Sequence, residues 1–109
     1  MAIQGNWDSL QRVVVRQGVS RKVFSGKNST MVLNEIEPGT IPRLHSHPHE
    51  QLLYIMSGTA EIVLGDEVLN LKAGDILLVP PDITHSLKAL GNETVLNLDV
   101  FSPIREDYL

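Results

Sequence analysis

The chain has 109 residues, of which 42% are hydrophobic and 20% are charged, and its net charge is -4. These values predict one globular domain with a modest core, and they exclude the strongly basic field that attracts nucleic acid. The chain has no cysteine, which excludes disulfides, thiolate nucleophiles and cysteine zinc sites, so any bound metal must use nitrogen and oxygen ligands.

The N-terminal residues lack the apolar centre of a signal peptide. No stretch approaches the ~20 apolar residues that cross a bilayer, so no membrane partner is expected. We expect a soluble, cytoplasmic protein, with which the absence of cysteine is compatible.

Short β-branched or alternating runs follow one another along the chain, and turn residues such as Pro38-Gly39 and Gly91-Asn92 separate them. No run has a helical pattern. The sequence therefore predicts an all-β antiparallel sandwich or barrel. Ten strands are predicted, over residues 12–15, 19–24, 30–37, 41–47, 51–57, 59–65, 67–71, 75–80, 85–90 and 94–101.

Histidines are concentrated in two short segments. His45, His47 and His49 alternate in one segment, and His85 ends the run GDILLVPPDITH. Residues two apart on a strand share a face, so Arg43, His45 and His47 are expected to point the same way. Imidazoles at this density predict a metal site.

The last predicted strand places Asn97, Asp99 and Phe101 on one face and leucine and valine side chains on the other. Either the apolar face fills the core and Asp99 lies in water, or the polar face lines a pocket. In the second case the surroundings of Asp99 could raise its pKa and suit it to move a proton. Phe101 would then be a ring platform or simply part of the core.

The chain contains two ordered motifs, GTIPRLHSHPHEQLLYIMSG at 39–58 and GDILLVPPDITH at 74–85, and they resemble the two motifs of the cupin superfamily. Gln51 stands where many members carry glutamate, and Asp82 stands where many carry glycine. The resemblance implies an all-β, single-domain cupin, which is an antiparallel β-barrel also called a double-stranded β-helix or jelly roll. The first motif contains Gly39, His45, His47, Gln51 and Gly58, and the second contains Gly74, Pro80, Asp82 and His85.

The resemblance also suggests how the chain is organised. One cupin domain is expected over residues 1–109. Its metal-site core is expected at about 39–101, with N-terminal strands in 12–36 and a short tail at 102–109. Small cupins commonly dimerise, and the apolar run Val13–Val15 would expose a strand edge in a monomer, so a homodimer that pairs edges near the N-terminus is predicted.

By resemblance, one divalent transition metal (Ni, Zn, Fe, Co or Mn) is expected at this site. Glu50 and His49 compete with Gln51 for the fourth position. An amide ligand leaves the full dipositive charge on the metal, which favours Lewis acid chemistry. The implied ligands are His45, His47, Gln51 and His85.

The segments HSHPHEQ, VPPDITHSL and LDVFSPIREDYL together resemble the KdgF group of small cupins, which are pectin-degradation proteins. This resemblance implies metal-dependent ring opening and ketonization of 4,5-unsaturated monouronates, released from pectin or alginate, to linear 5-keto uronates. The expected partner is thus a small anionic sugar. By the same resemblance, Asp99, Phe101 and Arg105 match residues that matter for activity.

Arg105 has two interpretations. It could contact the substrate carboxylate in bidentate fashion, or it could be a solvated arginine of the tail. Arg43 and Arg21 are further candidates for the carboxylate contact. Two other functions remain open, namely a cupin dioxygenase that uses Fe or Ni and a non-catalytic sugar-acid-binding cupin.

Overall fold

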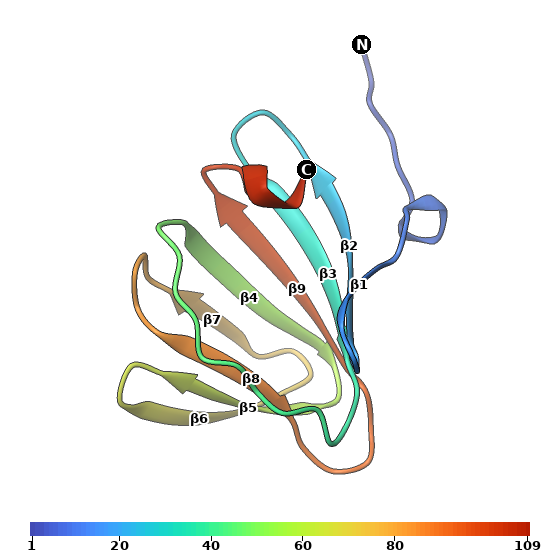
Figure 1. Ribbon diagram of the computed structural model, residues 1–109. Coiled ribbons are helices and arrows are strands. Elements are labelled where there is room, and N and C mark those ends of the chain that lie inside the picture. The colour runs from blue at the N-terminus through green and yellow to red at the C-terminus, as the bar shows by residue number, and fades with distance from the viewer.

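The computed structural model describes residues 1–109 and consists of nine strands and two single-turn 3-10 helices, η1 (Trp7–Ser9) and η2 (Glu106–Tyr108). The all-β prediction is confirmed, and the architecture is that of a jelly-roll cupin (Figure 1). The strands are β1 (Val13–Arg16), β2 (Val19–Ser25), β3 (Thr30–Ile36), β4 (Glu50–Ser57), β5 (Thr59–Leu64), β6 (Glu67–Lys72), β7 (Ile76–Val79), β8 (His85–Ala89) and β9 (Val95–Ser102).

The strands form two antiparallel sheets. The larger has six strands in the order β1-β2-β3-β9-β4-β7, and the smaller has three in the order β6-β5-β8. Strand β9 lies between β3 and β4, although these strands are far from it in the sequence. The C-terminal turn η2 lies beside the ends of β2, β3 and β9 (Figure 1). This order places residues of β3, β4 and β9 on one continuous inner surface.

The apolar core occupies only part of the interior. It includes Leu53 and Ile55 of β4, Ile62 of β5 and Val95 at the start of β9. Further along β9, the inward positions are Asn97 and Asp99, which are as buried as the core residues. The interior therefore changes from apolar to polar along β9, and buried polar groups require hydrogen-bond partners.

The alternation in β9 resolves the two interpretations of this strand. Val95, Asn97, Asp99 and Phe101 are buried, whereas the residues between them are only half-buried. The interpretation that placed Asp99 in water is therefore wrong. Leucine and valine cover the outer face of the sheet instead.

The strand predicted over residues 41–47 does not form, and this prediction is wrong. The segment contains a single β-bridge, between His45 and His85. Pro42 and Pro48 lack the backbone N–H that a strand ladder needs, which explains why pairing is confined to one residue between them. The bridge nevertheless aligns the two histidines.

Two exposed runs lie at sheet edges. β1 is an edge strand of the larger sheet and Val13–Val15 are exposed, while β6 is an edge strand of the smaller sheet. The predicted homodimer would cover such an edge, and it stays a prediction.

The helical segments are three residues each, and none could cross a membrane.

Gly58, in the turn between β4 and β5, has a left-handed backbone conformation and close neighbours that a substitution can test. Its φ is +83°, and an added Cβ would lie 2.9 Å from the Thr94 carbonyl oxygen. Gly39 also has a positive φ, +81°, but no atom lies within 4 Å of its added Cβ. We expect Gly58→Ala to lower the free energy of unfolding by about 3 kcal/mol, because strain and a backbone clash add. Gly39→Ala, the control, should cost about 1 kcal/mol. Equal losses in urea denaturation would contradict the clash.

Candidate metal centre and adjoining pocket

Three histidines form a cluster at the polar end of the interior, where His47 and His85 are buried and His45 is exposed. Backbone carbonyls orient their side chains. The Nδ1 atom of His45 lies 2.9 Å from the Arg43 carbonyl oxygen, and that of His85 lies 2.8 Å from the Ile83 carbonyl oxygen. Nδ1 of His47 lies 3.0 Å from the His49 carbonyl oxygen. A carbonyl can only accept, so Nδ1 carries the proton in each neutral ring. The Nε2 lone pairs remain free.

The backbone bridge brings two of these rings together. The N–H groups of His45 and His85 donate to each other's carbonyl oxygens at 3.0 and 2.8 Å. Directly opposed residues of an antiparallel pair project to the same side, and the two ring centroids are 4.3 Å apart. One ligand nitrogen from each of His45, His47 and His85 lies within 4.8 Å of the others. Three nitrogens each ~2.1 Å from one ion would lie ~3–4 Å apart, so the cluster is compatible with a metal ion.

The protonation states of His47 and His85 suit metal binding. Burial lowers the pKa of His85 to about 4, and burial is also the main cause that lowers the pKa of His47. These rings are therefore neutral at pH 7, as metal ligands must be. Nε2 of His85 is buried and has no hydrogen-bond partner in the protein. A buried acceptor without a partner fits a ligand position.

Gln51 adds an oxygen to the cluster. Its Oε1 lies 3.0 Å from Nε2 of His47, while its Nε2 donates to Oδ1 of Asp99 at 2.8 Å. Since Nδ1 of His47 carries the ring proton, Oε1 and Nε2 are two acceptors that face each other. A cation between them would relieve this contact, so the donor set fits a divalent metal with imidazole and amide ligands.

The two competing candidates lie elsewhere. Glu50 is exposed, because alternation along β4 turns it to the outer face. His49 lies outside the cluster, and its Nε2 is 3.1 Å from the Ile104 carbonyl oxygen. Of the three candidates, only Gln51 is buried and contacts the cluster, through His47.

Asp82 explains one departure from the cupin motif. Its φ is 66°, in the left-handed region that glycine favours and aspartate tolerates. Its N–H donates to the carbonyl oxygen of His47 at 2.8 Å. The turn before β8 thus holds the segment that carries His47.

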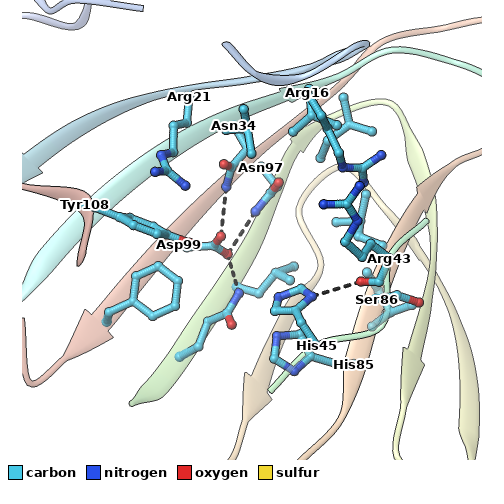
Figure 2. Close-up of a pocket in the computed structure, with 18 residues that line it drawn as sticks. Arg16, Arg21, Asn34, Arg43, His45, His85, Ser86, Asn97, Asp99 and Tyr108 are labelled. Carbon is cyan, nitrogen blue, oxygen red and sulfur yellow. Dashed lines mark hydrogen bonds between the residues drawn. The ribbon is translucent and has the colours of Figure 1, made fainter. Parts of the chain in front are cut away.

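Asp99 is bound by three side-chain amides (Figure 2). Gln51 and Asn97 donate to Oδ1, and Asn34 donates to Oδ2 at 2.8 Å. Burial raises the pKa of Asp99 to about 6, although the three amides and the charge of Arg105 oppose this rise. A carboxyl group with such a pKa exchanges its proton near neutral pH.

A pocket of about 260 Å³ opens beside the cluster and is lined by His45, His85, Gln51 and Asp99. Asp99 is the one acidic residue of its wall, whereas the wall contains three arginines. Figure 2 shows Arg21 on the side of Tyr108, and Arg16 and Arg43 on the side of Ser86. The excess of guanidinium groups favours an anionic ligand.

Of the remaining predicted residues, Phe101 lines this pocket and Arg105 does not. Phe101 is buried, lines the pocket and packs edge-on against the His47 ring, with centroids 5.3 Å apart. Arg105 is 7% exposed, so the interpretation as a solvated tail arginine is wrong. It donates to both carboxylate oxygens of Asp107, at 3.0 and 2.7 Å. It does not line the pocket.

Sequence reasoning missed Asn34, Arg16 and Tyr108. Asn34 was predictable, because alternation places it on the same face of its strand as the inward residues Val32 and Ile36. Tyr108 had none, since it follows the last strand and enters the pocket wall only through the fold of the C-terminal turn.

Comparison with known proteins agrees with this architecture. The model of the cupin domain family matches residues 32–101, a span that includes all four residues of the proposed ligand set. The pectin degradation protein KdgF of Dickeya dadantii is 33% identical over 94 residues, which cover 84% of each chain.

Two solved structures are similar in shape. KdgF from a Halomonas species superimposes with a TM-score of 0.85 at 29% identity and covers 94% of this chain and 95% of its own. An RmlC-like cupin from Shewanella frigidimarina superimposes with a TM-score of 0.88 at 24% identity and covers 96% and 94%. At 24% identity, the similarity to the Shewanella protein shows a shared fold alone.

Proposed function

The chain belongs to the cupin domain family, and from this premise we propose that it is an enzyme of uronate metabolism. Its reaction is the metal-dependent ring opening and ketonization of 4,5-unsaturated monouronates to linear 5-keto uronates. The similarity to proteins named KdgF supports a substrate derived from pectin. The three arginines of the pocket wall support an anionic sugar.

One contact carries the proposal. Through its two amide atoms, Gln51 joins His47 of the cluster to Asp99, at 3.0 and 2.8 Å. The candidate metal site and a carboxyl group with a pKa of about 6 thereby lie beside one pocket. An isomerisation that stabilises an enolate and moves a proton needs these two groups side by side.

His45, His47, His85 and Gln51 would hold the metal, because their free nitrogen and oxygen atoms face one another. When bound, a divalent ion supplies Lewis acidity that stabilises negative charge on a substrate oxygen. The sequence and the donor set admit Ni, Zn, Fe, Co or Mn.

Asp99 is proposed to carry the proton. Ring opening removes the proton of the C1 hydroxyl, breaks the bond between C1 and the ring oxygen, and leaves an aldehyde at C1 and an enolate at C5. Protonation at C4 then gives the ketone, so the net change moves one proton from oxygen to carbon. Oδ1 of Asp99 already accepts two hydrogen bonds and Oδ2 accepts one, which leaves Oδ2 the freer atom for this proton. Arg105 would act through its charge, which opposes the rise in the pKa of Asp99.

The direct test is to incubate the metal-loaded protein with 4,5-unsaturated galacturonate and follow the ultraviolet absorbance of the conjugated double bond. We expect the absorbance to disappear faster than in buffer and faster than with chelator-treated protein. Decay at the buffer rate would contradict the proposal. Uptake of oxygen that depends on substrate would identify a dioxygenase, and tight uronate binding without turnover would identify a binding module.

Gln51→Glu tests the value of a neutral ligand. We expect the metal to be retained and kcat to fall about tenfold or more. The added negative charge weakens the metal as a Lewis acid. In addition, a carboxylate oxygen replaces Nε2 of Gln51, which donates to Asp99 in the parent protein. Metal content and turnover are measured together. Gln11→Glu, the same change at an exposed position, is the control. Unchanged turnover in Gln51→Glu would show that the amide is incidental.

A further inference from the structure

Of the three arginines in the pocket wall, Arg21 is the one prepared for a ligand. Its Nε is buried and has no hydrogen-bond partner, and its guanidinium group takes part in no ion pair. Arg16 already donates to the Ile41 carbonyl oxygen at 2.7 Å, and Arg43 is exposed. A buried donor without a partner is costly, and an anionic ligand would satisfy it.

The guanidinium of Arg21 is held in place by an aromatic ring. Its Cζ lies 3.6 Å from the centroid of the Tyr108 ring. This distance is that of a stacked cation–π contact, which leaves the edge of the guanidinium plane free for in-plane hydrogen bonds. Tyr108 belongs to η2 and lines the same pocket, so the C-terminal turn shapes the wall around Arg21 (Figure 2).

The other candidate for the carboxylate, Arg105, is already engaged. Both oxygens of the Asp107 carboxylate accept from its guanidinium, and its Cζ lies 4.0 Å from the Tyr108 ring centroid. Nη1 of Arg105 is also buried without a partner, but Arg105 does not line the pocket. A bidentate contact with a substrate would have to replace the pair with Asp107. Arg105 therefore stabilises the C-terminal turn through Asp107 and lies outside the pocket wall.

Arg21 also lies on the correct side of the pocket for the reaction. It is the cross-strand partner of Asn34, whose amide donates to Oδ2 of Asp99 at 2.8 Å. Directly opposed side chains start ~5 Å apart, so Asn34 connects Arg21 to Asp99, and all three residues line the same pocket. In a 4,5-unsaturated uronate the carboxylate is attached to C5, and the carbon to be protonated is the adjacent C4. The carboxylate-binding residue must accordingly neighbour the proton donor.

We propose that Arg21 binds the substrate carboxylate and that Tyr108 is the positioning residue that stacks against it. The inference rests on the proposed function for the identity of the substrate. It assigns the specificity for an anionic sugar to β2 and to the C-terminal turn.

Arg21→Met removes the guanidinium and retains an unbranched side chain. We expect KM for 4,5-unsaturated galacturonate to rise about 10- to 100-fold, as for a lost charged hydrogen bond, with kcat within about threefold. Metal content and melting temperature should not change. Arg12→Met, at a surface arginine, is the control. Arg21→Lys keeps the positive charge but lacks the planar group that stacks on Tyr108, so it should give an intermediate KM. This variant also tests the inference if Arg21→Met does not fold. Tyr108→Leu should raise KM, and Tyr108→Phe should restore most of the affinity.

A binding measurement separates this inference from the proposed function. By calorimetry, the metal-loaded parent should bind D-galacturonate more tightly than neutral D-galactose, and Arg21→Met should lose that preference. If the parent turns over the uronate and Arg21→Met keeps both its KM and its preference while Arg105→Met loses them, the assignment to Arg21 is overturned and the function stands. If the parent shows no turnover but its preference depends on Arg21, the function fails and the anion site stands.

Discussion

Replacing His85 by alanine should remove the metal from the purified protein. The ring nitrogens of His45, His47 and His85 converge within 4.8 Å, and Nε2 of His85 is buried without a protein partner. Losing a residue that merely orients a ligand typically costs 10- to 100-fold in metal affinity, so losing the ligand itself should cost more than about 100-fold. Elemental analysis should find about one transition metal per parent chain and almost none in His85→Ala or His45→Ala.

His49→Ala is the matched control for this experiment. It removes an imidazole from the same segment, but His49 faces the Ile104 carbonyl oxygen rather than the cluster. We expect it to keep a full complement of metal. Stoichiometric metal in His45→Ala and His85→Ala would refute the ligand assignment, and metal lost from His49→Ala alone would place the site elsewhere.

Asp99→Asn should lower kcat by about a hundredfold or more, the usual effect of losing a general acid or base. The substitution retains the size of the side chain, which is buried among Gln51, Asn97 and Asn34. An amide cannot exchange a proton near pH 6, as the carboxyl group of Asp99 does. We expect the fold, the metal and most of the substrate affinity to remain, so the loss should appear in kcat rather than in KM.

The assay follows the ultraviolet absorbance of the unsaturated uronate, with metal content measured on the same samples. Asp66→Asn makes the same chemical change in the exposed turn between β5 and β6 and should leave kcat unchanged. If metal-loaded Asp99→Asn turns over like the parent, another group carries the proton. Circular dichroism of the variant excludes a loss of fold as the cause.

Strand placement was largely predictable, because period-2 alternation and turn residues are local signals. The prediction failed for residues 41–47, where the apolar and polar pattern suited a strand but Pro42 and Pro48 prevent a ladder. The histidine spacing still indicated a metal site, because the single bridge between His45 and His85 aligns their rings without a strand.

The sequence alone determined the family, the all-β class and the histidines of the cluster, since these follow from motifs within short segments. It determined that Asn97, Asp99 and Phe101 share a face of one strand, but alternation does not tell which face is buried. The tertiary structure decided this, because β9 lies between β3 and β4 and turns that face toward the smaller sheet.

Contacts between distant segments were likewise decided only by the tertiary structure. The amide of Gln51 reaches Asp99 across 48 positions of sequence, and the amide of Asn34 reaches it across 65. The ring of Tyr108 stacks on Arg21, which comes from the second strand. Spacing within a segment predicts which face of a strand a side chain occupies. The pairs described here depend instead on the order of the strands in the sheet and on where the C-terminal turn packs. No short-range pattern encodes either.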